Sequence, residues 1–377
     1  MNRHPIAVGF GVGTQPPIGR VRGLSLLGRA LRADSLWTVD HFVGLFPRSV
    51  WDGDFSWTAK QGDTPDAFFD WQVLLGHLAK RVGRRAQLAV GVTEPIRRHP
   101  VLIAQAAMTL AHLARRAPIL GIGAGERENI EPYGLDFSRP VGTLEEALQI
   151  IRLCFESDGP FDFHGDHFRL TDAVLDLRPP VGRVPEIWVA AHQERMLRLT
   201  GTYGDGWYPT FPMSPEVYAG KLAVVREAAA ATGRDPDAIT PAMQAFVVMA
   251  RTETGARRLF ESKALRYASL LMSDAVWKRQ GLTHPLGEGF RGMVDIVPQR
   301  MSREQVEDAI ARVPGDQLAG EAIWGTPSMV ADKLQALGEA GLRHVVLVPL
   351  SAMVSRRAAV DTVWGMFTVA RRLRSGS

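Results

Sequence analysis

The chain has 377 residues, 46% of them hydrophobic, which is enough for one elaborated barrel domain or two smaller domains. Its net charge is only +4, with acidic and basic residues interspersed, so we exclude the basic surface of a nucleic-acid-binding protein. The one cysteine, Cys154, excludes an internal disulfide and a cysteine zinc cluster, and it favours a cytoplasmic protein. No apolar run approaches the roughly 18 residues of a membrane span, and the first residues lack a signal-peptide core.

Short apolar segments alternate with helical patterns along the chain, which is typical of βαβ units and a parallel sheet. The predicted strands cover residues 6–10, 35–39, 86–90, 119–123, 186–190, 245–250 and 344–348, with a weaker candidate at "DGWYP". The last helix before the final strand has clear signals, with Thr326 as N-cap, Pro327 at its first position and Gly341 at its end. These elements predict a TIM-like (β/α)8 barrel, and a doubly wound open sheet is the alternative.

We predict that residues 1–377 form a single barrel domain with two insertions. They lie near residues 42–72, which are rich in Trp, Phe, Asp and Gly, and near residues 251–320, which are partly helical. Long insertions in a compact domain usually form lids or binding loops. The aromatic segment "WDGDFSWTAKQGD" in the first insertion either packs in a core or faces the substrate.

The residues directly after each strand are the candidate site, because catalytic residues of such barrels lie at the C-terminal strand ends. Asp40 and His41 follow the second strand, and Glu126 follows the fourth strand. These groups suit a site that binds a planar molecule and moves protons. Two alternatives remain: His41 could be structural, and Glu126 could pair with Arg97 or Arg98.

Two polar segments need an interpretation of their own. The glycines of "PILGIGAGERENI" do not fit a dinucleotide fingerprint, because acidic residues follow at once instead of a helix with an acid about 20 residues on. We interpret the segment as a barrel strand that turns at glycines and ends in an acid. "HGDH", residues 164–167, is interpreted as a solvated turn, and no metal site is predicted.

Four long segments together resemble the luciferase-like oxidoreductases: "LWTVDHF", "LAVGVTEPIRRHPVLIAQAAMTL", "ILGIGAGERENIEPYG" and "PEIWVAAHQERMLRLTGTYGDGW". Within that superfamily the chain is similar to the branch that depends on coenzyme F420, which includes ketoreductases, and the similarity runs over nearly the whole chain. The resemblance implies a barrel that binds F420 at its C-terminal mouth, with FMN as the alternative cofactor. It also implies a small-molecule substrate and a homodimer.

The resemblance also implies roles for individual residues. Asp40 and His41 match an Asp-His pair beside the reacting ring, and Glu126 matches a carboxylate proposed as proton donor. The implied cofactor-binding residues are Asp40, Gly91, Val92, Thr93, Gly123, Ala124, Gly125, Ala190, Ala191 and His192. Of these, Gly91 and Val92 match a bulge behind the ring, commonly with a cis peptide, and Ala190 to His192 match backbone amides that bind the phosphate before a helix. The chain departs from the family at Gln193-Glu194, where Gly-Pro is usual, which adds a negative charge near that phosphate.

These features predict an F420-dependent oxidoreductase that transfers a hydride between the deazaflavin C5 and a carbonyl, imine or activated alkene, and that could be a ketoreductase. His41 and Glu126 are the candidate proton donors, and Asp40 is expected to orient the imidazole. One alternative is an FMN-dependent luciferase-like monooxygenase. The other is a non-catalytic barrel that only binds a flavin or deazaflavin.

Overall fold

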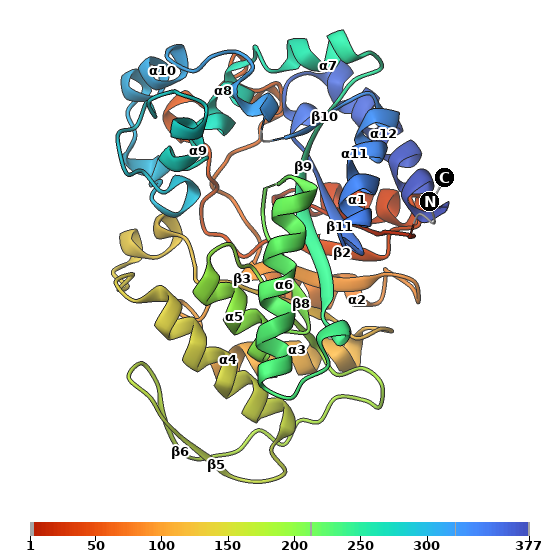
Figure 1. The fold of residues 1–377 in the computed structure, drawn as a ribbon, viewed down its shortest axis with the longest axis vertical. Helices are drawn as coiled ribbons and strands as arrows, with labels where there is room; N and C mark the ends of the chain where they lie inside the picture. The colour runs from red at the N-terminus through yellow and green to blue at the C-terminus, as the bar shows by residue number, and fades with distance from the viewer. Residues whose placement is uncertain (1–3, 212, 321, 376–377) are drawn as a thin grey trace.

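The fold is a closed barrel of parallel strands in a computed structural model that describes residues 4–211, 213–320 and 322–375 (Figure 1). The barrel strands are β1 (Ala7–Gly11), β2 (Ser35–Thr38), β3 (Gln87–Thr93), β4 (Ile119–Ile122), β7 (Glu186–Val189), β8 (Gly206–Trp207), β9 (Thr240–Met249) and β11 (His344–Pro349). Each strand pairs with its neighbour in parallel, and the β8–β9 pairing closes the sheet. The predicted TIM-like barrel is confirmed, and the open-sheet alternative is wrong.

Four strands differ from the prediction. β9 begins at Thr240, five residues before the predicted start, because its first residues pair with β8. Pro241 lies in this part of β9, and a proline in the sequence argues against a strand because it has no N–H to donate. A short extra strand, β10 (Ile323–Gly325), pairs with the far end of β9 outside the barrel. "HGDH" forms the turn of an antiparallel hairpin, β5 (Phe161–His164) and β6 (Arg169–Ala173), that sequence analysis did not predict.

Helices surround the barrel: α1 (Ile18–Ala30), α2 (Trp71–Ala79), α3 (Pro100–Leu113), α4 (Pro140–Glu156), α5 (Glu194–Tyr203), α6 (Pro215–Ala231), α11 (Pro327–Glu339) and α12 (Arg356–Ser375). The predicted start of α11 is confirmed, since the Thr326 side chain accepts a hydrogen bond from the Met329 amide and Pro327 is the first helical residue. The amide of Ile6 donates to the carbonyl of Leu373 at 2.9 Å, which holds α12 beside the first strand. In the part of the chain that the structure describes, no helix is both long and apolar enough to cross a membrane.

The interior of the barrel is filled by aromatic side chains from β2, from β7 and from the residue directly after β8. Trp37 stacks on Tyr208 with ring centroids 4.5 Å apart, and Trp188 packs against both rings. The Trp37 indole nitrogen donates to the Ser35 hydroxyl at 2.6 Å, so its polar atom is satisfied inside the barrel. This packed layer of rings forms the floor of the open space at the C-terminal ends of the barrel strands.

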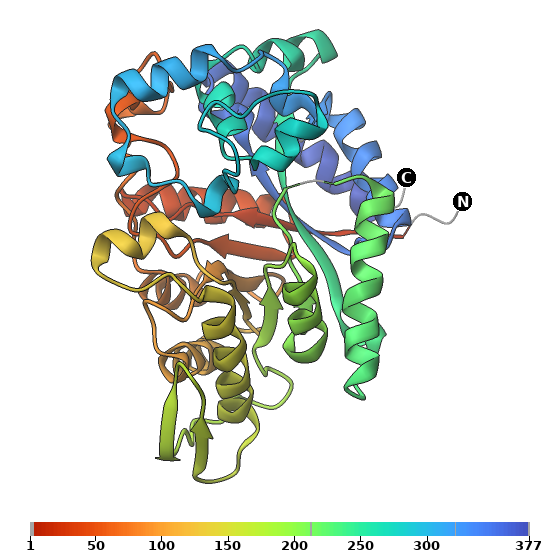
Figure 2. The same cartoon turned by 60° about the vertical axis from the view of Figure 1, so that its left-hand side comes forward.

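The two insertions pack against each other at one end of the molecule (Figures 1 and 2). The second insertion contains α7 (Glu253–Leu259), α8 (Lys263–Leu270), α9 (Asp274–Arg279) and α10 (Arg303–Ala311). Val50 and Phe55 of the first insertion share a buried cluster with Tyr267 and Trp277 of the second. The insertions therefore support one another, while the single-domain boundary at 1–377 stays a prediction.

Candidate active site

A cavity of about 2100 Å³ opens at the C-terminal ends of the barrel strands. The predicted site residues that line it are Asp40, His41, Gly91, Val92, Thr93, Gly123, Ala124, Gly125, Glu126, Ala190 and His192. Ala191 does not line it, because its side chain is fully buried beneath the rim. Both insertions add apolar wall residues, among them Phe46, Leu271 and Phe290.

His41 presents one ring nitrogen to Glu126 and keeps the other for the protein backbone. Its Nδ1 lies 3.0 Å from the carbonyl oxygen of Val43, and its Nε2 lies 3.4 Å from Glu126 Oε2. We assign the Nδ1 proton to the bond with the carbonyl, because a carbonyl oxygen can only accept. Nε2 is therefore the nitrogen that can exchange a proton with Glu126 or with a ligand.

Asp40 links neighbouring segments at the rim of the barrel. It was expected to orient the imidazole of His41, but its hydrogen bonds go to other side chains. Its carboxylate accepts hydrogen bonds from the Thr93 hydroxyl at 2.6 Å and from Arg98 Nε at 3.0 Å. Burial opposes ionisation of this side chain, but Arg98, Arg97 and Thr93 outweigh it and lower the pKa of Asp40 below its usual value. Asn129 Nδ2 at 3.1 Å and the Val43 carbonyl, rather than Asp40, surround Nδ1 of His41.

The alternative ion pairs of Glu126 with Arg97 or Arg98 are not formed. Arg97 binds Glu94 at 2.5 Å, and Arg98 binds Asp40 and also Asp70 at 2.7 Å. The Glu126 side chain, about a quarter exposed, faces His41 at the cavity wall instead. A carboxyl group and an imidazole thus lie side by side where a ligand can reach both.

Glu128 and Asn129 are site residues that sequence reasoning missed. They lie on a single 3-10 turn, Arg127–Asn129, directly after Glu126. Asn129 Nδ2 donates to Glu128 Oε1 at 2.9 Å, and Asn129 Oδ1 accepts from the Phe42 amide at 2.7 Å, so this residue links the ends of β2 and β4. Burial and the nearby charge of Glu126 raise the pKa of Glu128 to about 10. Glu126, Glu128 and Glu131 lie close together in the sequence, and nothing in the sequence indicated which of them is buried.

Glycines at the rim of the barrel let the backbone lie close to neighbouring side chains and change direction. The Gly91–Val92 peptide is cis, at a register shift between β3 and β4, as the resemblance implied. A Cβ on Gly91 would lie 2.6 Å from the Trp37 ring, so only glycine fits there. Gly125 has φ +93°, and a Cβ on it would lie 2.6 Å from Ile130. The glycines of the fourth strand therefore serve a strand end, as interpreted from the sequence.

The region proposed to bind the cofactor phosphate contains one backbone amide that already donates a hydrogen bond within the protein. It also contains one cation that sequence analysis missed. The Ala190 amide donates to the Ile122 carbonyl at 2.9 Å, so it cannot also bind a phosphate. Lys221 of α6 lines the cavity, and its ammonium donates to the His192 carbonyl. Among the described residues no carboxylate pairs with Lys221. The added charge of Glu194 is paired with Arg198 at 2.8 Å, and Glu194 does not line the cavity.

Comparison with known proteins identifies the family. A family model described as luciferase-like monooxygenase matches residues 15–344. A phthiodiolone/phenolphthiodiolone dimycocerosates ketoreductase of Mycobacterium tuberculosis is 39% identical over 335 residues, 88% of either chain. An F420-dependent glucose-6-phosphate dehydrogenase of Amycolatopsis mediterranei is 32% identical over 204 residues, 52% of this chain and 55% of the relative. The structure of an F420-dependent secondary alcohol dehydrogenase, in complex with an F420-acetone adduct, superposes with a TM-score of 0.72 at 18% identity over 98% of both chains.

The chain belongs to the luciferase-like monooxygenase family, and it is an oxidoreductase built on that family's barrel.

Proposed function

We propose that the protein is an F420-dependent oxidoreductase that reduces the carbonyl group of a large, mainly apolar substrate. The observation that carries this proposal is the His41–Glu126 pair, with Nε2 and Oε2 3.4 Å apart at the wall of the cavity. The ketoreductase and the F420-dependent dehydrogenase among its relatives support the same assignment. An oxidoreductase acting on a carbonyl needs a proton donor at that oxygen, and this pair supplies one.

The described residues fit a deazaflavin with an anionic tail. Gly91, Gly123, Ala124 and Ala190 form a stretch of small side chains on the cavity wall, which leaves a surface that a flat ring can approach. Lys221, which has no carboxylate partner in the described part of the chain, supplies a cation at the end where we place the phosphate. When bound and reduced, F420 would supply a hydride from its C5 atom.

The side chains of the site would orient the substrate and supply the proton. Negative charge builds on the carbonyl oxygen as the hydride arrives, so a donor beside it lowers the barrier, by roughly 10²- to 10⁴-fold for general acids. Glu126 is our first candidate for this donor and His41 Nε2 the second. The Val43 carbonyl, to which Asn129 Nδ2 also donates, holds the imidazole in place while Asp40 fixes the rim.

The size of the cavity supports a large substrate. Ordinary small-molecule pockets measure roughly 300–1,000 Å³, whereas this cavity measures about 2100 Å³. Much of its wall comes from the insertions, which contribute the apolar side chains of Leu45, Phe46, Trp51, Met272 and Met293 beside charged ones such as Lys278 and Arg291. A substrate whose carbonyl sits beside Glu126 could therefore extend an apolar chain along this wall.

Binding of purified protein to F420, FMN and NADPH tests the cofactor. We expect F420 to bind more tightly than FMN, with quenching of the deazaflavin fluorescence, and to weaken as salt is added because its tail is anionic. Micromolar FMN binding without any F420 binding would favour the monooxygenase alternative. Binding of F420 with no turnover of any carbonyl substrate would favour the non-catalytic alternative.

We also propose that the protein is a homodimer that associates through α2 and α3. These neighbouring helices expose Val73, Leu102 and Leu113, with side chains 75%, 57% and 47% exposed. Large apolar side chains gathered on adjacent helices are typical of protein–protein contacts.

A further inference from the structure

We propose that Glu128 is a neutral carboxylic acid that shares one proton with Glu126, so that the acid of this site is a carboxyl pair rather than Glu126 alone. The inference rests on the proposed function for its role in turnover. The proton-sharing itself can be tested on the protein without any cofactor.

The geometry of the pair comes from the turn after β4. Glu128 is completely buried, while Glu126 lines the cavity and is partly exposed. One side-chain atom each of His41, Glu126 and Glu128 lies within 4.8 Å of the other two. The three groups therefore run from the protein interior to the cavity wall.

One carboxylate oxygen of Glu128 lacks a donor. Oε1 accepts from Asn129 Nδ2 at 2.9 Å, but Oε2 is buried with no hydrogen-bond partner among the described residues. An ionised carboxylate with a bare buried oxygen is strongly unfavourable. A proton on Oε2 removes this problem, because the hydroxyl can then donate to the Glu126 carboxylate that faces it.

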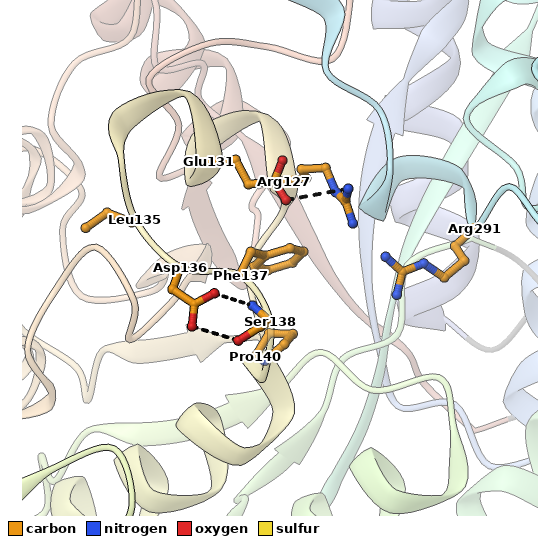
Figure 3. A pocket seen from close by; sticks show the side chains of 8 residues that line it. All are labelled: Arg127, Glu131, Leu135, Asp136, Phe137, Ser138, Pro140 and Arg291. Atoms are coloured by element: carbon orange, nitrogen blue, oxygen red, sulfur yellow. Dashed lines mark hydrogen bonds and ion pairs between the residues drawn. The ribbon is translucent and has the colours of Figure 1, made fainter.

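No cation neutralises Glu128 in the described part of the chain. Arg127, the residue between the two acids, points into a neighbouring cleft towards Glu131, at 3.5 Å (Figure 3). It also lies 3.4 Å from Asp295. The titratable groups that face Glu128 are Glu126, His41 and the phenol of Tyr267, which donates to the Leu45 carbonyl. With burial and the charge of Glu126 both acting, the pKa of Glu128 rises to about 10, in agreement with the neutral form.

The pair gives a balanced account of proton delivery. Reduced F420 would supply a hydride to the substrate's carbonyl carbon, and the carbonyl oxygen would take a proton from Glu126, giving the alcohol and oxidised cofactor. The one proton that the pair shares passes from Glu128 to Glu126 and on to the carbonyl oxygen, which leaves both carboxylates ionised, and Glu126, on the solvent-accessible side, then takes up one proton to restore the pair. Two ionised carboxylates in contact are unfavourable, so the doubly charged pair recovers a proton readily.

Infrared spectroscopy of the cofactor-free, EDTA-treated protein tests the shared proton. We expect the carbonyl stretch of one protonated carboxylic acid to persist at about pH 8, where ordinary carboxyl groups are ionised. Glu128→Gln should abolish that band. Glu131→Gln, which removes a nearby acid outside the pair, should leave it unchanged. Absence of the band in the wild type, or its survival in Glu128→Gln, would overturn the proposal.

A second variant keeps Glu128 itself intact, in case Glu128→Gln does not fold. In Glu126→Gln the repulsion from Glu126 is gone, so the band should titrate about one pH unit or more lower than in the wild type. An unchanged midpoint would mean that the two acids do not share a proton. Stoichiometric binding of Zn²⁺ with loss of the band would also contradict the proposal, because metal ligands must be ionised.

Turnover then tests the role of the pair. Glu128→Gln keeps shape and can still donate a hydrogen bond, but it cannot pass a proton, so kcat should fall roughly 10²-fold with F420 binding nearly unchanged. Full activity with an unaltered pH profile in Glu128→Gln would assign Glu128 a structural role only. If the protein does not bind F420, the proposed function is wrong, but the infrared test of the cofactor-free protein still decides whether the two acids share a proton.

Discussion

Glu126 lies at the point where the proposed chemistry meets the cavity, so its substitution separates binding from catalysis. Glu126→Gln preserves the size and polarity of the side chain but removes the exchangeable acid. We expect F420 binding close to that of the wild type and a kcat lower by roughly two orders of magnitude or more. Stopped-flow measurement with saturating reduced cofactor checks this. Wild-type turnover across neutral pH would instead leave His41 as the proton donor.

Lys221 tests where the anionic part of the cofactor binds. Lys221→Met keeps most of the chain length and removes the charge, so F420 affinity should fall about 10-fold and the dependence on salt should become weaker. Lys263→Met is the matched control, because Lys263 binds the exposed Asp54 and neither residue lines the cavity. Equal salt dependence in the wild type and Lys221→Met would place the phosphate elsewhere.

At the scale of the elements, Asp40 ties the end of β2 to β3 and to the segment before α3 through Thr93, Arg97 and Arg98. Its lowered pKa means that this carboxylate stabilises the fold above the unfolded-state pKa, and that the contribution is lost as pH falls through the folded-state pKa. Asp40→Asn should therefore lower the free energy of unfolding at neutral pH by roughly 3 kcal/mol, with a smaller difference below about pH 4.

Urea unfolding at several pH values measures this effect. Asp70→Asn is the control, since Asp70 also binds Arg98 but is exposed, and asparagine caps α2 about as well as aspartate. We expect little loss in that variant. A loss in Asp40→Asn that stays constant from neutral to acid pH would show that packing, and not the charge, stabilises the rim.

At the scale of the whole molecule, the apolar surface of α2 and α3 predicts self-association. A charged side chain in the middle of a dimer interface is strongly unfavourable, so Leu102→Glu should give a monomer in sedimentation equilibrium. Val360→Glu, at an exposed position of α12, which packs against α11, should leave the oligomer unchanged. A monomeric wild type would contradict the homodimer proposal directly, while the barrel and its site would be unaffected.

The sequence by itself determined the barrel and the position of the site. Apolar strands that alternate with helices specify a parallel sheet, and a parallel strand directs the residues at its C-terminal end to one face. Asp40, His41, Gly91 and Glu126 could therefore be assigned to a common rim. The homodimer and the cytoplasmic location stay predictions, as do the catalytic and cofactor-binding roles of these residues.

Only the tertiary structure decided which acid is buried and which partner each side chain has. Glu126 and Glu128 are both glutamates and lie two positions apart in the sequence. Glu126 nevertheless faces the cavity, whereas Glu128 is completely buried. Asn129 contacts His41 across 88 positions of the chain, and Lys221 reaches the His192 carbonyl across 29. Such contacts depend on how distant segments meet in space, and no local pattern encodes that meeting, so desolvation and proton sharing follow from the fold alone.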